Sequence, residues 1–262
     1  MFRPISALRK FYRIILLGLW LLVGIVFTLI FLRNTIPTHG LQSRIVKNWL
    51  GRAARIFGVR IKCYGTPLPQ RTLFVANHIS WLDILVLGSL VPIHFLSKYE
   101  VKTMPVFGWL ATRAGTLYIQ RGNTRSASES SSEITAVLNQ QHNSLVFAEG
   151  TTTDGHIRKF HSRMMQSAID AHAMVQPVAI FYPVKNPDTG KTELNPATLF
   201  VGNMSTGESF DRVIRAARID VEVHFLAPIN STGKTRAEIA QHAFDEVVEA
   251  VNLIKNRRED SQ

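Results

Sequence analysis

The chain has 262 residues, of which 46% are hydrophobic, and a formal net charge of +11. This length is enough for one globular core, or for one core with a membrane anchor. The single cysteine, Cys63, excludes an internal disulfide and fits a reducing compartment. The positive charge belongs to the N-terminal third: the first 82 residues contain twelve basic side chains and no acidic one, whereas the rest contain 18 basic and 19 acidic ones.

Residues 14–32 form an uncharged, almost wholly apolar segment of 19 residues. As a helix it would be about 28 Å long, close to the roughly 30 Å thickness of the hydrocarbon core of a bilayer. It is too long for the apolar part of a signal peptide, and no small-residue cleavage site follows it. We therefore expect a membrane helix. Basic residues on both sides are explained if both flanks contact one anionic leaflet, and the adjacent apolar segment favours lipid over nucleic acid as the partner.

Residues 41–58 predict an amphipathic helix with one apolar half and one basic half. The pattern fits a helix that lies in the membrane interface, with Trp49 at the depth of the headgroups. It also fits a helix packed on the core of the domain, with its basic face in solvent. Both interpretations remain open. We assign residues 1–58 to a membrane anchor and residues 59–262 to a second domain.

Predicted strands and helices alternate through the second domain, which indicates an α/β fold. An exposed loop is expected at residues 183–195, which are rich in Pro, Asn, Asp and Gly. A capping box, Thr235-Arg236-Ala237-Glu238, predicts the start of the last helix. The strands are expected at residues 59–64, 72–76, 93–97, 116–120, 144–148, 175–182, 199–201 and 219–226, and the other helices at 81–90, 126–139 and 163–172.

The segment Asn77-His78-Ile79-Ser80-Trp81-Leu82-Asp83 follows an apolar strand and ends on the first acidic residue of the chain. Ser80 can cap the helix that follows, which places His78 in a strand-to-helix turn and Asp83 in the first helical turn. A carboxylate that accepts one imidazole N–H fixes the tautomer and makes the other ring nitrogen a better base. Alternatively, Asp83 is a capping residue that reaches back to the Ser80 amide.

A second polar segment, Glu149 to Gly155, follows the strand predicted at residues 144–148. An acidic residue at the end of a buried strand, followed by Gly150 and three threonines, is suited to holding a polar ligand. Lys98 and Arg121 also end predicted strands, and they could converge on an anionic headgroup. A metal-dependent hydrolase is a rival interpretation, with ligands from Glu149, Asp154, His156 and His161, although their spacing matches no common zinc pattern.

These segments resemble the glycerolipid acyltransferase family, in particular its bacterial 1-acyl-sn-glycerol-3-phosphate acyltransferases. The resemblance covers residues 59–230 and rests on blocks in a fixed order. It implies a central mixed sheet flanked by helices, like that of glycerol-3-phosphate acyltransferase, preceded by the membrane helix and the amphipathic helix. The blocks are His78 with four residues before Asp83, the block Lys98…Pro105…Gly108…Arg121, then Glu149-Gly150-Thr151, and last Val175-Gln176-Pro177-Val178.

The resemblance implies transfer of an acyl chain from acyl-CoA or acyl carrier protein to the hydroxyl of a lysophospholipid, without a cofactor or metal. His78 would take the hydroxyl proton, and Asp83 would orient His78. The acceptor would be bound by Glu149, Gly150, Thr151 and Thr152, and its phosphate by Lys98 and Arg121. The enzyme would lie at the inner (cytoplasmic) membrane, with its catalytic domain on the cytoplasmic face. A basic membrane tether without enzymatic activity is the alternative, but it gives no role to His78 and Asp83.

The third block departs from the family pattern Pro-Glu-Gly-Thr-Arg, because Ala148 replaces the proline and Thr152 replaces the arginine. A hydroxyl group cannot provide the bidentate charge with which that arginine binds phosphate. Either Arg158, Lys159 or Arg163 takes over, or the acceptor is not lysophosphatidic acid. We expect 1-acyl-sn-glycerol-3-phosphate as the acceptor, giving phosphatidic acid. The alternative is a lyso-ornithine lipid or another lysophospholipid, because family members with Thr at this position resemble lyso-ornithine lipid acyltransferases.

Overall fold

The computed structural model describes residues 4–31, 40–120 and 124–257. Its centre is a mixed sheet in the order β1-β9-β6-β2-β5-β3-β4, with β10 paired to β6. Strands β6, β2, β5, β3 and β4 run parallel, whereas β9 is antiparallel to β6 and parallel to β1. The strands are β1 (Val59–Tyr64), β2 (Thr72–Ala76), β3 (His94–Lys98), β4 (Leu117–Ile119), β5 (Ser144–Phe147), β6 (Met174–Phe181), β9 (Ile219–Phe225) and β10 (Ile229–Asn230).

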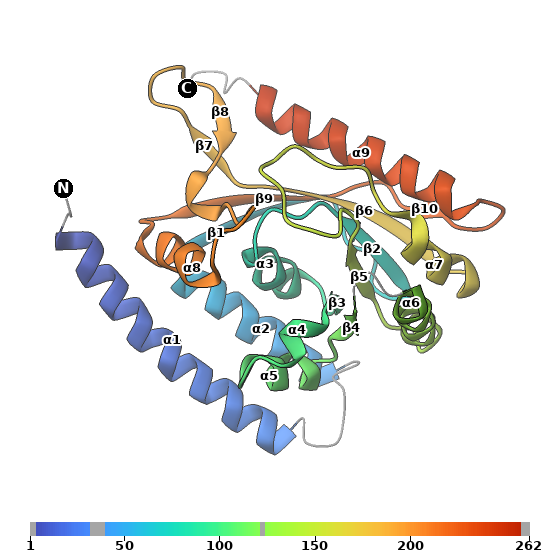
Figure 1. Ribbon diagram of the computed structural model, residues 1–262, viewed down its shortest axis with the longest axis horizontal. Coiled ribbons are helices and arrows are strands. Elements are labelled where there is room, and N and C mark those ends of the chain that lie inside the picture. Colours follow the sequence, from blue (N-terminus) through green and yellow to red (C-terminus); the bar gives the residue numbers. More distant parts are fainter. Residues whose placement is uncertain (1–3, 32–39, 121–123, 258–262) are drawn as a thin grey trace.

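Helices cover both faces of this sheet (Figure 1). Helix α9 (Arg236–Asn256) packs on β6 from one side, and α3 (Leu82–Leu90) lies on the other side with α2 (Gly40–Ile56) packed against it. Helices α6 (Thr124–Asn139) and α7 (Gln166–Asp170) pack together near β5 and β10. The fold is therefore the helix-flanked mixed sheet that the sequence predicts. The capping box at the start of α9 is also confirmed, since Thr235 and Glu238 bond each other's backbone N–H groups.

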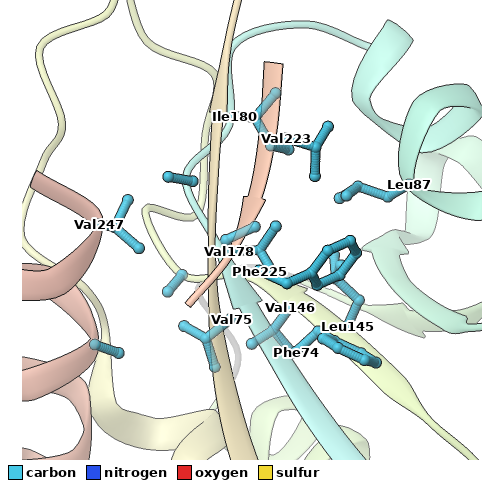
Figure 2. Close-up of a cluster of buried hydrophobic side chains, with 14 of the residues drawn as sticks. Phe74, Val75, Leu87, Leu145, Val146, Val178, Ile180, Val223, Phe225 and Val247 are labelled. Atoms are coloured by element: carbon cyan, nitrogen blue, oxygen red, sulfur yellow. The ribbon is translucent and has the colours of Figure 1, made fainter. Parts of the chain in front are cut away.

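The core lies on both sides of β2, whose five residues are all buried. A strand that is covered on both faces is expected to be continuously apolar, as Thr72–Ala76 almost is. Figure 2 shows Phe74 packed with Leu145, Phe225 and Leu87 on the α3 side, while Val75 points toward Val247 of α9. This close packing on two faces fixes the carboxyl end of β2, from which the segment that carries His78 and Asp83 begins.

Several local predictions were wrong. The expected loop at residues 183–195 contains a hairpin of β7 (Pro183–Lys185) and β8 (Thr192–Leu194), and its turn is closed by Asn186, whose side chain accepts two backbone N–H bonds. Residues 199–201 follow a short 3₁₀ turn (Pro196–Thr198) and join no sheet. Residues 163–172 form a 3₁₀ turn (Ser162–Met165) and the short α7 rather than one helix. Sequence reasoning also missed α4 (Tyr99–Lys102), α5 (Phe107–Arg113) and α8 (Thr206–Arg215).

Helix α1 (Pro4–Phe31) contains the predicted apolar segment but begins ten residues earlier than predicted. Its basic first turns pack against the end of α8: Lys10 pairs with Asp211 at 2.6 Å, and Arg13, only 8% exposed, donates to the carbonyls of Ile214 at 3.0 Å and Ala216 at 2.6 Å. Backbone carbonyls at a helix C-terminus have no intrahelical partner and attract cations. Lys10 and Arg13 therefore bind the domain.

Residues 6–31 of α1 are long and apolar enough to cross a membrane. The rest of the protein leaves this apolar part mostly uncovered, since only 11% of its most apolar stretch of 18 residues is buried. Helix α2 lies beside it, and the indole N–H groups of Trp20 and Trp49 each donate to the other residue's carbonyl at 3.0 Å. A Cβ at Gly24 would lie 2.8 Å from the Trp49 ring, so glycine allows this close contact. Since α2 also packs its buried Ala53 and Ala54 toward the domain, the structure favours core packing for this helix.

We predict that Arg13→Met lowers the free energy of unfolding by about 2–3 kcal/mol, because it leaves buried carbonyl groups of α8 without a donor. Thermal unfolding in detergent, followed by circular dichroism, measures the change. The matched control is Arg125→Met, because Arg125 has a side chain that is 88% exposed and pairs with Glu129 on its own helix. Equal losses in both variants would contradict the role given to Arg13.

Candidate functional site

The carboxyl ends of the parallel strands meet at one edge of the sheet. β2 is followed by His78, β5 by Glu149, and β3 ends at Lys98. In open α/β sheets this edge is where ligands bind. The topology therefore brings together the polar segments that lie far apart in the sequence.

His78 and Asp83 form the centre of the site. The imidazole Nδ1 lies 2.8 Å from Asp83 Oδ2, and the Asp83 side chain is fully buried whereas that of His78 is 16% exposed. The same carboxylate oxygen accepts the backbone N–H groups of Ile79 at 2.8 Å and Ser80 at 3.0 Å. Asp83 thus contacts the imidazole and also reaches back to the Ser80 amide. The two contacts that the sequence offered as alternatives are both present.

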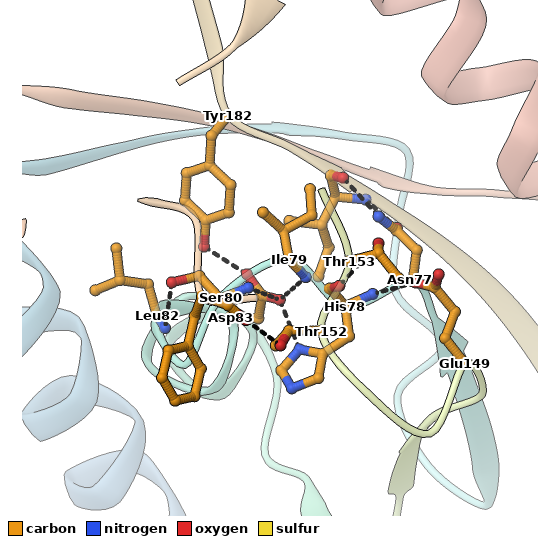
Figure 3. A network of polar contacts seen from close by, with 12 residues as sticks. Asn77, His78, Ile79, Ser80, Leu82, Asp83, Glu149, Thr152, Thr153 and Tyr182 are labelled. Carbon is orange, nitrogen blue, oxygen red and sulfur yellow. Dashed lines mark hydrogen bonds and ion pairs between the residues drawn. The ribbon is translucent and has the colours of Figure 1, made fainter. Parts of the chain in front are cut away.

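Tyr182 completes this network from the end of β6 (Figure 3). Its hydroxyl group donates to Asp83 Oδ1 at 2.6 Å, and its side chain is fully buried. Burial and the neighbouring carboxylate raise the pKa of Tyr182 well above its usual value, so the phenol stays a donor. Since the Asp83 carboxylate is an acceptor, the ring hydrogen is assigned to Nδ1 of His78, which leaves Nε2 with the free lone pair. Figure 3 shows Nε2 turned away from the carboxylate.

Two further contacts hold the turn that carries His78. The imidazole stacks on Phe147 of β5, with 3.8 Å between ring centroids and 14° between the planes. Asn77, which is buried, pairs with the backbone of Ile180 in both directions, at 2.9 Å and 2.8 Å. The turn is therefore tied to the strands on both sides of β2, and the ring has one supported orientation.

Glu149 is 3% exposed and lies behind this turn. Its Oε1 accepts the backbone N–H of His78 and its Oε2 that of Arg158, each at 2.8 Å. Burial raises the pKa of Glu149, against the effect of these hydrogen bonds. The Thr153 N–H donates to the His78 carbonyl at 2.9 Å, so both backbone groups of His78 are bonded to the segment that begins at Glu149. The carboxylate thereby joins the two polar segments through the backbone.

The other predicted residues are distributed around this centre. Gly150 has a φ of 70°, a conformation that favours glycine, and a Cβ there would meet the ring of His161 at 3.3 Å. Thr151 is half-buried, and the half-buried Thr152 donates its hydroxyl hydrogen to the Phe200 carbonyl. Lys98 is exposed at the end of β3. Arg121 lies outside the described residues.

The metal-site interpretation has no donor set in the part of the chain that the structure describes, where no three His, Cys, Asp or Glu side chains could share an ion. Both oxygens of Glu149 accept backbone N–H groups, and Asp154 pairs with His156 on the surface. Two hollows of about 350 Å³ open elsewhere, one between β1, β7 and α9 and one beside Phe160 and α9. Neither is lined by His78, whose imidazole keeps 16% of its surface exposed at the carboxyl edge of the sheet.

Comparison with known proteins identifies the family. Residues 60–181 match the family model described as Acyltransferase. The chain is 39% identical to the lyso-ornithine lipid O-acyltransferase of Pseudomonas aeruginosa, over 78% of this chain and 76% of that protein. The chain belongs to the glycerolipid acyltransferase family.

Two other similarities agree with this assignment. The 1-acyl-sn-glycerol-3-phosphate acyltransferase of Neisseria gonorrhoeae is 29% identical over 71% of this chain and 72% of that protein. The crystal structure of the 1-acyl-sn-glycerophosphate (LPA) acyltransferase from Thermotoga maritima matches the fold with a TM-score of 0.70, at 18% identity, over 97% of this chain and 98% of that chain. The predicted family and fold class of the acyltransferase are thus confirmed.

Sequence reasoning missed Tyr182, Phe147 and Asn77 as parts of the acyltransferase site. A weak signal existed for Tyr182, because a tyrosine that ends a buried apolar strand needs a partner for its hydroxyl group. Nothing in the sequence indicates that this partner is Asp83, which is 99 positions away.

We predict that Tyr182→Phe makes the stability of the acyltransferase less sensitive to alkaline pH. The unfolded phenol ionises near pH 10 while the native one keeps its proton, so wild-type stability falls as pH rises above about 10, by up to roughly 1.4 kcal/mol per pH unit. The variant lacks this contribution. Chemical unfolding between about pH 9 and pH 11 measures the slopes. The control is Tyr99→Phe, at an exposed tyrosine, which should keep the wild-type slope of unfolding free energy against pH. If Tyr182→Phe also has the wild-type slope, the prediction is contradicted.

Proposed function

We propose that this protein transfers a fatty acyl chain from an acyl thioester to the free hydroxyl of a lysolipid, with His78 as the general base and Asp83 as the residue that orients it. The carrying observation is the His78–Asp83 contact of 2.8 Å, with Nε2 directed away from the carboxylate at the carboxyl edge of the sheet. Tyr182 and Glu149 act as positioning residues, because they bond Asp83 and the His78 backbone.

The proposed reaction needs no covalent acyl-enzyme, because a thioester is already activated. Nε2 of His78 takes the proton of the acceptor hydroxyl as its oxygen attacks the thioester carbonyl carbon. The C–S bond then breaks, and the imidazolium returns the proton to the leaving thiolate. Asp83 stabilises the imidazolium between these steps, and the stacked Phe147 ring keeps the imidazole plane fixed.

For the acceptor, we propose a lyso-ornithine lipid ahead of 1-acyl-sn-glycerol-3-phosphate, which reverses the order expected from the sequence. Thr152 occupies the position of the family's phosphate-binding arginine, and its hydroxyl group bonds the Phe200 carbonyl. An ornithine lipid carries no phosphate and needs no such arginine. The 39% identity to an enzyme named for lyso-ornithine lipid supports this choice. Arg158, Lys159 and Arg163 are exposed on the segment after Glu149, and they would have to supply the positive charge if lysophosphatidic acid were the acceptor.

The acyl donor is acyl-CoA or acyl carrier protein, both of which present the chain as a thioester. We propose that α1 attaches the enzyme to the inner membrane, with the catalytic domain on the cytoplasmic face. The exposed apolar side chains along α1 support membrane attachment. Both ends of α1 lie beside the domain, at α8 and at α2 and α5. This placement fits a helix that enters one leaflet. If α1 crossed the whole bilayer, the parts of the domain that contact its two ends would have to lie within the bilayer.

We predict that His78→Ala lowers the rate of acyl transfer by about 10²–10⁴-fold, the range typical of a lost general base. Purified enzyme in mixed micelles, with thioester donors and lysolipid acceptors, gives the rate by product mass spectrometry. His156→Ala is the matched control, because that histidine has a side chain that is 93% exposed. Membrane attachment should survive in both variants. Full activity of His78→Ala would refute the base assignment.

The acceptor is tested by a panel of lysolipids. The wild-type enzyme is expected to acylate lyso-ornithine lipid faster than lysophosphatidic acid, and Thr152→Arg should shift the ratio toward lysophosphatidic acid by about tenfold, the effect of one charge-assisted bidentate contact. Thr151→Arg serves as the control, since it adds the same charge one position away. A wild-type preference for lysophosphatidic acid would reject the proposed acceptor, whatever the rate of the reaction.

A further inference from the structure

The turn between α4 and α5, residues 103–107, exposes several apolar side chains to solvent. Phe107 is 58% exposed, and Met104 and Val106 are each 40% exposed. Exposed apolar residues are ordinary when they are scattered, but a cluster at one turn marks a contact surface. Together with Tyr99, which is 46% exposed, they form what we name the apolar turn.

The backbone of the apolar turn holds these side chains outward. Val106 has a φ of 61° and a ψ of −56°, a conformation that is rare for a β-branched residue. Gly108 lies two residues later, and a Cβ at this position would lie 2.2 Å from the Lys102 carbonyl oxygen, so the chain can turn tightly only with glycine. Backbone strain of this kind persists where the surrounding structure requires it and concentrates at functional segments.

The apolar turn leads into a helix that lies against α1, whose apolar surface is also exposed. Helix α5 contacts α1, and Figure 1 shows it beside the C-terminal part of that helix. Along α1 the large side chains Leu19, Leu22, Val26 and Leu29 are about half exposed or more. Because α1 is long enough to enter a membrane, the same lipid bilayer is the partner that fits both α1 and the apolar turn.

Charge at the edge of the apolar turn fits a lipid surface as well. The Lys102 ammonium group lies 5.6 Å from the ring centroids of both Tyr99 and Tyr118. Aromatic and basic side chains together are typical of the headgroup region of a membrane. Glu100 opposes this attraction, but Lys98 and Lys102 leave the segment 98–102 with one net positive charge.

We propose that the apolar turn is a second membrane contact, which inserts into the leaflet that holds α1. The proposal rests on the membrane attachment proposed above. The turn follows β3, whose carboxyl end lies at the same edge of the sheet as His78, two strands away. Insertion at this point would hold the catalytic edge down on the bilayer, where a lysolipid presents its hydroxyl group.

The test places a nitroxide spin label at one position at a time in the full-length chain, in a Cys63→Ser background. Phe107→Cys reports on the apolar turn, Leu22→Cys on α1, and Leu253→Cys on a 64% exposed leucine of α9 on the far side of the sheet. Each protein is bound to vesicles of phosphatidylcholine and phosphatidylglycerol. Electron paramagnetic resonance then compares collisions of the label with oxygen, which is enriched in lipid, and with a water-soluble nickel complex.

The expected result is that the labels at 22 and 107 lose nickel collisions and gain oxygen collisions on vesicles, while the label at 253 stays accessible to nickel. A label at 107 that behaves like the one at 253, while the one at 22 is buried, overturns the apolar-turn proposal and leaves membrane attachment standing. Nickel access at all three positions would reject membrane attachment as well. Shielding at 107 that depends on protein concentration and not on lipid would assign the turn to a second copy of the chain and also overturn the proposal.

Discussion

The buried carboxylate of Asp83 is the interaction on which the site depends. A buried carboxylate is strongly unfavourable unless donors surround it. Four groups supply them: the imidazole of His78, the amides of Ile79 and Ser80, and the hydroxyl of Tyr182. The carboxylate thereby fixes the turn, the start of α3 and the end of β6 at one point, and it leaves Nε2 of the imidazole without a bond to Asp83.

The position of this carboxylate is set by the sheet. β2 lies between β6 and β5, and it is covered on both faces, so its end cannot move independently of its neighbours. Asn77 bonds the β6 backbone, Phe147 of β5 stacks on the imidazole, and Glu149 accepts the His78 amide. Catalytic groups need a geometry fixed within fractions of an ångström, and a packed central strand provides it.

Helix α1 combines an exposed apolar surface with specific bonds to the domain. Its apolar side chains are uncovered, as a membrane helix requires, while its first turns are bonded to the carbonyls at the end of α8 through Arg13. Helix α8 in turn reaches the candidate site, because Ser209 accepts the indole N–H of Trp81, next to Ser80 in the turn that carries His78. Helix α1 and the candidate site are therefore joined by one set of contacts, which suits the proposed acylation of a lipid that resides in the bilayer.

Features that rest on short-range spacing could be predicted from the amino-acid sequence. The pairing of His78 and Asp83 follows from five positions across a strand-to-helix turn, and the apolar length of α1 and the capping box of α9 are equally local. The groups that surround these features are set by the tertiary fold. Tyr182 meets Asp83 across 99 residues, and Glu149 bonds backbone amides although its position suggested a ligand contact. Such contacts depend on how strands are ordered in the sheet, and no window of sequence contains that order.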